Sequence, residues 1–349
     1  MAHELSNVNG RFECAYAAGQ PAPWHAGVTD PEYFDASTAD GATVARASGI
    51  EWEIMASPVM YRGPEGYLTD ETLKMQFRSD NGAPLGVVGA AFQTTQPKNG
   101  FDTMQRIVDA TGAQWDAAFS LFGGRKLVFQ AKLPAAGIQV KDGDVSHSYV
   151  TFAYACDGTM PRSIWFSEVR AVCNNMLRYS FGAAQKDKMS RLFRQSHKTE
   201  FNPDAIVDAI GIIEEARAEQ LTVLQAMARV ELESKDSQEL LARILGKPSI
   251  QNRDKGDDGA PKISKPEQEI LRLYAGDARG ADMAGQTAYG LLNAVTEYTD
   301  HHYGRSADAR INSMLMGPNA QLKDKAFSVL AEHTRECTGS DLLRSLLAK

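Results

Sequence analysis

The chain of 349 residues is long enough for one large domain or two ordinary ones. Its formal net charge of −7 excludes a uniformly basic protein that coats nucleic acid, although it leaves room for a local basic patch. No apolar run reaches the ~18 residues of a membrane helix, and the four scattered cysteines form no Cys-x-x-Cys pair. We therefore expect neither a membrane span nor structural zinc, and free thiols without a signal peptide are typical of a cytoplasmic protein.

Changes in periodicity divide the chain into five regions. Residues 1–48 are rich in small and polar residues and predict an N-terminal arm whose aromatic side chains pack back on the body. Residues 49–200 predict an α+β core domain, in which a twisted, mostly antiparallel sheet packs against one or two helices. Residues 201–246 predict a helical hairpin or one long helix, 247–265 a flexible linker, and 266–349 a C-terminal helical region.

Several elements of the core domain can be predicted individually. A short antiparallel meander follows residue 51, and a helix over Phe101–Thr111 ends at Gly112. Two further strands form a hairpin around the adjacent glycines 123 and 124. Strict alternation over Ser148–Tyr154 indicates another strand, and the strand after it is expected to pass into a helix near Asn174.

The segment from Met160 to Thr199 has a local excess of positive charge. It contains eight basic and two acidic residues, a balance of +6 that leaves −13 for the rest of the chain. Cations neutralise phosphates and aromatic faces stack on unpaired bases, so together these residues predict a groove for single-stranded nucleic acid. The candidate contacts are Arg162, Trp165, Arg170, Arg178, Tyr179, Phe181, Lys186, Lys188, Arg191, Arg194 and Lys198.

The same residues allow a plainer interpretation. The cations can form a solvated face that pairs with the acidic remainder of the same or a neighbouring subunit, with the aromatic side chains in the core. If the segment near Asn174 is helical, Arg170, Asn174 and Arg178 share one face of that helix.

A second group of candidate residues lies near the C-terminus. Asn293, Glu297 and His301 are spaced four residues apart on a predicted helix, with Asp300 beside them. A carboxylate and an imidazole one turn apart can bind a metal or transfer a proton. A polar stripe that hydrogen-bonds to a neighbouring helix explains the same spacing, and we favour this structural interpretation. No site for a nucleotide or other cofactor is predicted, because no phosphate-binding loop or nucleophile elbow is present.

Four blocks together resemble the "phage/plasmid-like protein" family. Trp24 and His25 lie in a Pro-Trp-His-Ala-Gly loop that resembles the family's Pro-Trp-His-x-x-Gly signature, with a shortened spacing, although a packed aromatic turn explains this loop as well. Leu85–Gly89 resembles the central glycine segment that precedes a short helix. Val169–Leu177, which includes Asn174, and Asn293–His301 resemble the two most distinctive blocks.

This resemblance implies a protein of phages, plasmids and genomic islands in a bacterial cytoplasm, with a role in DNA replication, recombination or defence against the host. The order of sheet and helix is also similar to that of single-strand annealing recombinases. Our first expectation is therefore a homo-oligomer that binds or anneals single-stranded DNA. Two alternatives are a host-interaction or anti-defence protein that acts through protein–protein binding, and a metal-dependent enzyme that uses Glu297, Asp300 and His301.

Overall fold

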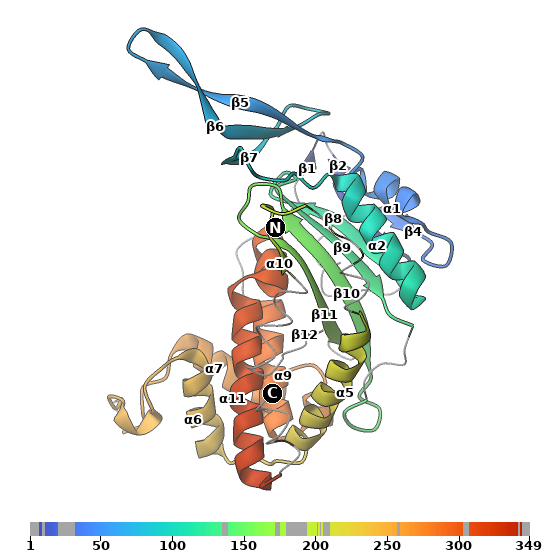
Figure 1. Cartoon of the computed structure of the whole chain (residues 1–349). Helices are drawn as coiled ribbons and strands as arrows, with labels where there is room; N and C mark the ends of the chain where they lie inside the picture. Colours follow the sequence, from blue (N-terminus) through green and yellow to red (C-terminus); the bar gives the residue numbers. More distant parts are fainter. Residues whose placement is uncertain are drawn as a thin grey trace.

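The computed structural model describes residues 7–8, 11–19, 32–134, 139–171, 175–178, 194–200, 202, 204, 210–256, 259–302, 307–340 and 343. Two larger sheets and a set of helices make up most of them (Figure 1), and a short ladder joins β1 (Asn7–Val8) to β2 (Arg11–Phe12). The pairing is mostly antiparallel and the C-terminal region is helical. The α+β class predicted from the sequence is confirmed.

The main sheet has eight strands in the order β12-β11-β10-β9-β8-β3-β4, with β13 also beside β11. Strands β8 to β12 are consecutive antiparallel neighbours and form a meander, whereas β4 runs parallel to β3. The strands are β3 (Cys14–Ala17), β4 (Glu32–Phe34), β8 (Gln114–Leu121), β9 (Lys126–Lys132), β10 (Ser146–Ala155), β11 (Arg162–Arg170), β12 (Met176–Arg178) and β13 (Arg194–Gln195).

The second sheet contains β5 (Ile54–Gly63), β6 (Gly66–Arg78) and β7 (Pro84–Gly89). β5 and β6 form a long hairpin that projects away from the body in Figure 1. β7 pairs only with the root of this hairpin, over Leu73–Phe77 of β6. The sheet therefore has three strands near the body and two farther out.

Local signals explain the helix and the hairpin that the sequence predicts in the core. α2 (Pro97–Thr111) has proline in its first turn and ends at Gly112, whose φ of 68° is left-handed. A Cβ atom on Gly100 of this helix would lie 2.4 Å from the Phe129 ring, so glycine permits the close approach of α2 to β9. The turn between β8 and β9 uses Gly123 and Gly124, with φ of 72° and 96°. Both predictions are confirmed.

Helices cover both faces of the main sheet. On one face, Trp115 and Phe129 pack with Phe101 of α2, in a core that continues into the C-terminal helices. On the other face, Phe119 and Val128 pack against a smaller apolar cluster with Leu315. Besides α2, the helices among the described residues are α1 (Gly41–Ser48), α5 (Ile210–Met227), α6 (Ser234–Leu245), η2 (Ile250–Asn252), α7 (Lys265–Arg272), η3 (Leu273–Asp277), α8 (Ala281–Ala284), α9 (Ala288–Glu297), η4 (Tyr298–His302), α10 (Ala307–Met316) and α11 (Pro318–Thr338).

The structure differs from the predictions in three places. Cys14–Ala17 is an inner strand of the main sheet, between β8 and β4, rather than part of a loose arm. Pairing with these two neighbours stabilises so short a strand, and the local sequence does not reveal that pairing. Met176–Arg178 pairs with β11 instead of lying in a helix near Asn174. The described part of residues 201–246 is not one long helix, because α5 ends at Met227, Glu231 pairs with Thr287, and α6 begins at Ser234.

Candidate nucleic-acid interface and polar helix junction

Arg162 begins β11 and is only 2% exposed. Its guanidinium donates to the Thr95 hydroxyl at 2.6 Å and to the carbonyls of Gln93, Ser196 and Thr199 at 3.0–3.1 Å. Burial lowers the pKa of Arg162 below its usual value. The side chain therefore fastens residues 196–199 to the body and is not presented to a DNA backbone.

Arg170 ends β11 and is also buried. Its Nε donates to Asp144 at 2.6 Å, and its Nη2 donates to the carbonyl of Gly280 at 3.0 Å. The guanidinium carbon lies 5.6 Å from the centre of the Tyr289 ring, and the Tyr289 hydroxyl donates to the same Asp144 carboxylate. Arg170 thus joins the sheet to the helical region. As direct phosphate contacts, Arg162 and Arg170 fit the structure poorly, because their hydrogen-bonding groups are engaged inside the protein.

Two other cations of the basic segment that the structure describes are more accessible to solvent. Arg194 in β13 and Lys198 just after it are exposed. Trp165 is half-buried against the smaller apolar cluster on the main sheet, the one that contains Leu315. Its indole N–H has no hydrogen-bond partner. The side chain of Arg178 and all of Tyr179, Phe181, Lys186, Lys188 and Arg191 lie outside the described residues.

Within the basic segment, two short strands pair with the same edge of β11. β12 pairs with Ser167–Val169 of β11, and β13 pairs with Arg162–Ser163 of the same strand. Residues 179–193 therefore connect two points on the same edge. His197 reinforces the second point, because its ring nitrogens lie 3.2 Å from the carbonyls of Gln93 and Met160. The ring also stacks on Phe92, with 4.3 Å between centroids.

A polar hollow of about 320 Å³ adjoins this attachment. Its charged lining residues are Asp102, Arg106, Arg162 and Glu200. Because two acids balance two bases, the hollow has no charge preference for a polyanion. Within the described part of the basic segment, the exposed side chains of Arg194 and Lys198 are better suited to bind phosphates than the hollow is.

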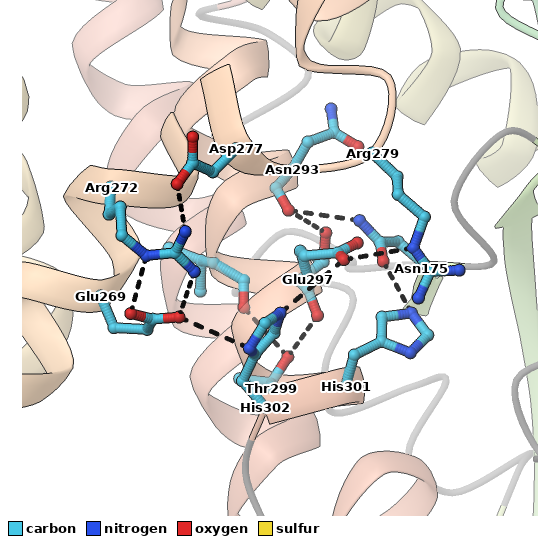
Figure 2. A network of polar contacts seen from close by, with 12 residues as sticks. Asn175, Glu269, Arg272, Asp277, Arg279, Asn293, Glu297, Thr299, His301 and His302 are labelled. Carbon is cyan, nitrogen blue, oxygen red and sulfur yellow. Dashed lines mark hydrogen bonds and ion pairs between the residues drawn. The ribbon is translucent and has the colours of Figure 1, made fainter. Parts of the chain in front are cut away.

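The polar stripe near the C-terminus joins α9 and η4 to the turn before β12. Asn175 donates to the carbonyl of Asn293 at 3.3 Å and lies 3.1 Å from Nε2 of His301. Figure 2 shows Asn175 reaching both residues. The two most distinctive blocks of the sequence, Val169–Leu177 and Asn293–His301, therefore meet in space.

Asp300 has a related structural role. One carboxylate oxygen accepts from the backbone N–H of Met176 at 2.8 Å, and the other accepts from the Lys323 ammonium of α11 at 2.7 Å. Both side chains of this ion pair are fully buried. Asp300 thereby holds β12 and α11 together.

Glu297 is the member of the stripe with the fewest polar contacts. It is 3% exposed, and its nearest basic side chains are Arg279 at 3.6 Å and His302 at 3.9 Å (Figure 2). One carboxylate oxygen has no hydrogen-bond partner. Glu297, Asp300 and His301 thus contact different groups, and no cluster of three or more His, Cys, Asp or Glu side chains suited to a metal is found among the described residues. This arrangement favours the structural interpretation of the stripe. Trp24, His25 and Asn174 lie outside the described residues.

Comparison with known families identifies the family to which the chain belongs. Residues 84–325 match the family described as "Domain of unknown function (DUF932)", and this match covers well over half of the chain. The protein therefore belongs to that family. No curated protein and no solved structure matches the chain. The helices within the described ranges include none long and apolar enough to span a membrane.

Sequence reasoning missed the partners that engage the predicted residues. Each of three predicted residues hydrogen-bonds to a partner far along the chain. Arg170 bonds to Asp144, 26 residues away, His301 to Asn175, 126 residues away, and Asp300 to Lys323, 23 residues away. No local pattern marks such partners. Of these partners, Asn175 alone lies in a block that the sequence analysis recognised, Val169–Leu177, but the predicted residue there was its neighbour Asn174.

Proposed function

We propose that the protein binds single-stranded DNA, and promotes its annealing, along the edge of the main sheet formed by β11 and β13. The basic segment supplies the contacts, namely Arg194 and Lys198 together with Arg178, Lys186, Lys188 and Arg191. Trp165, Tyr179 and Phe181 are the aromatic candidates for stacking on bases. Annealing by alignment of two strands requires no covalent chemistry.

The attachment of the basic segment to β11 is the main observation in favour of this proposal. β12 and β13, which flank residues 179–193 in the chain, both pair with the same edge of β11, and Arg194 and Lys198 are exposed. Arg162 and Arg170 take a different role from the one predicted. Each lies at one end of β11 and holds the scaffold that carries the exposed cations.

The test is fluorescence anisotropy of a labelled oligothymidine at several salt concentrations. We expect the wild-type protein to bind with an affinity that falls as salt rises. The Arg194→Glu/Lys198→Glu variant should weaken binding, and each lost phosphate contact should reduce the slope of log affinity against log salt by about 0.7. Adding Lys186→Glu, Lys188→Glu and Arg191→Glu should abolish binding.

A matched control separates the site from net charge. Lys235→Glu/Lys247→Glu makes the same charge change at two exposed positions of the helical region. This control should bind as the wild type does. Equal losses in both double variants, or no binding by the wild type at low salt, would contradict the proposal.

A further inference from the structure

The hairpin of β5 and β6 exposes an unusual amount of apolar surface. Ten large hydrophobic side chains are exposed among the described residues, and seven of them lie on β5, β6 and β7. They are Met55, Met60, Tyr61, Tyr67, Leu68, Leu73 and Val87. Gathered apolar side chains of this kind mark a surface that another molecule covers.

The outer half of the hairpin, residues 59–70, is termed here the distal arm. It has five paired positions, from Val59 opposite Asp70 to Gly63 opposite Gly66, and an irregularity next to Val59 separates it from the root. Apolar side chains lie on both of its faces, since Tyr61 pairs with Leu68 while Met60 and Tyr67 occupy the alternate positions. Tyr67 is 73% exposed and Met60 is 61% exposed.

The distal arm also has unpaired backbone edges. β7 begins its pairing with β6 at Leu73, and no described strand pairs with the outer edge of β5. A ribbon of two strands is marginally stable alone in water, and a third strand stabilises it. Exposed edges with apolar side chains are templates for that addition.

The geometry of the arm favours a second copy of this chain as the source of the added strand. If two arms lie side by side and point the same way, β6 of one copy meets β5 of the next in antiparallel orientation, which continues the pattern within each hairpin. One arm offers a β5 edge and a β6 edge, so each copy can pair on both sides. Such head-to-tail contacts form rings or filaments.

Charge supports the same partner. The distal arm contains one basic residue, Arg62, and two acidic residues, Glu65 and Asp70. A nearly neutral contact surface suits two chains that each have a net charge of −7, because like charges do not meet there. A nucleic acid, in contrast, would meet more acidic than basic groups on this arm.

We infer that the distal arm, residues 59–70, assembles the protein by pairing its β6 edge with the β5 edge of a second copy. This inference does not depend on DNA binding. It assigns assembly and nucleic-acid contact to separate surfaces, the arm and the β11 edge.

Sedimentation velocity without nucleic acid, over a series of protein concentrations, tests the inference. We expect the wild type to form oligomers whose mass rises with concentration. Tyr61→Lys/Leu68→Lys and Tyr61→Glu/Leu68→Glu should each remain monomeric, because like charges would face each other across the contact. An equimolar mixture of the two variants should form oligomers again, since opposite charges then meet.

Two controls keep each outcome informative. Tyr33→Glu/Val145→Glu alters two exposed apolar residues away from the arm and should assemble as the wild type does. Tyr61→Thr/Leu68→Thr introduces threonine, which favours strands, but removes the large apolar side chains. This variant should weaken assembly roughly tenfold or more. Thermal melting reports whether each variant folds.

Three results would overturn the inference. They are a wild type that stays monomeric at every concentration, arm variants that retain wild-type mass, and a mixture that fails to reassemble. A monomeric wild type would indicate instead that a different macromolecule covers the arm. Arg194→Glu/Lys198→Glu should assemble normally, so loss of DNA binding and loss of assembly can be distinguished.

Discussion

β11 and the distal arm differ in which kinds of side chain they bury and which they expose. β11 has a basic residue buried at each end, Arg162 and Arg170, whereas the arm exposes Tyr61, Tyr67 and Leu68 to solvent. A buried cation requires polar partners within the fold, and both arginines of β11 have them. An exposed apolar ribbon has few contacts within its own chain and offers a surface for another molecule to cover. Residue type alone would have assigned the cations to the surface and the aromatic side chains to the core.

The largest effect is expected from removal of a buried cation. Arg162→Met should lower the free energy of unfolding by about 3 kcal/mol or more, because the carbonyls of Gln93, Ser196 and Thr199 lose their donor in a buried place. Urea unfolding measures this change. Arg243→Ala, which removes an exposed ion pair with Glu332, should cost less than about 1 kcal/mol. Similar losses in the two variants would show that Arg162 is not a structural anchor.

A double-mutant cycle examines the other buried charges. Lys323→Met alone should cost about 3 kcal/mol, because Asp300 then keeps a buried carboxylate without its ammonium partner. Lys323→Met combined with Asp300→Asn should cost less than the sum of the two single changes, since neither charge is left alone. Strictly additive losses would indicate that the pair does not act as a unit.

The sequence predicted the parts of this arrangement that are encoded locally. Gly112 ends α2, Gly123 and Gly124 form the β8–β9 turn, and alternation marks β10. It did not predict the burial of Arg162, because the partners at Thr95 and Ser196 are distant in the chain. It also did not predict exposure of the arm, since Tyr61, Tyr67 and Leu68 are residue types found in covered and in uncovered hairpins alike.

The attachment of the basic segment should depend on pH through His197. Burial lowers the pKa of His197, so the unfolded chain takes up a proton at a higher pH than the folded protein does. Stability from the neutral ring is present above the unfolded pKa of about 6.5 and is lost as pH falls below it, by at most about 1.4 kcal/mol per pH unit. His197→Gln should flatten unfolding free energy against pH between about pH 7 and 5.

His147 supplies the comparison for this experiment. Burial also lowers the pKa of His147, and nearby Lys132 lowers it further, but its ring is less buried than that of His197. His147→Gln should therefore flatten the pH profile by a smaller amount. A His197→Gln profile parallel to that of the wild type would exclude His197 from the pH dependence.

The smallest effect on folding is expected at the arm, even though the arm has the largest proposed effect on assembly. Tyr67→Thr should change the unfolding free energy of dilute, monomeric protein by less than about 0.5 kcal/mol, because a side chain that is 73% exposed loses few contacts. At concentrations where the wild type assembles, the same variant should melt at a lower temperature than the wild type, since association stabilises only the folded chain. Differential scanning calorimetry over a range of concentrations measures both quantities. A large loss at every concentration would place Tyr67 in the folding core of its own chain. Concentration-independent melting of the wild type would instead remove assembly as the reason for exposing the arm, and the contrast between β11 and the arm would then need another partner to explain it.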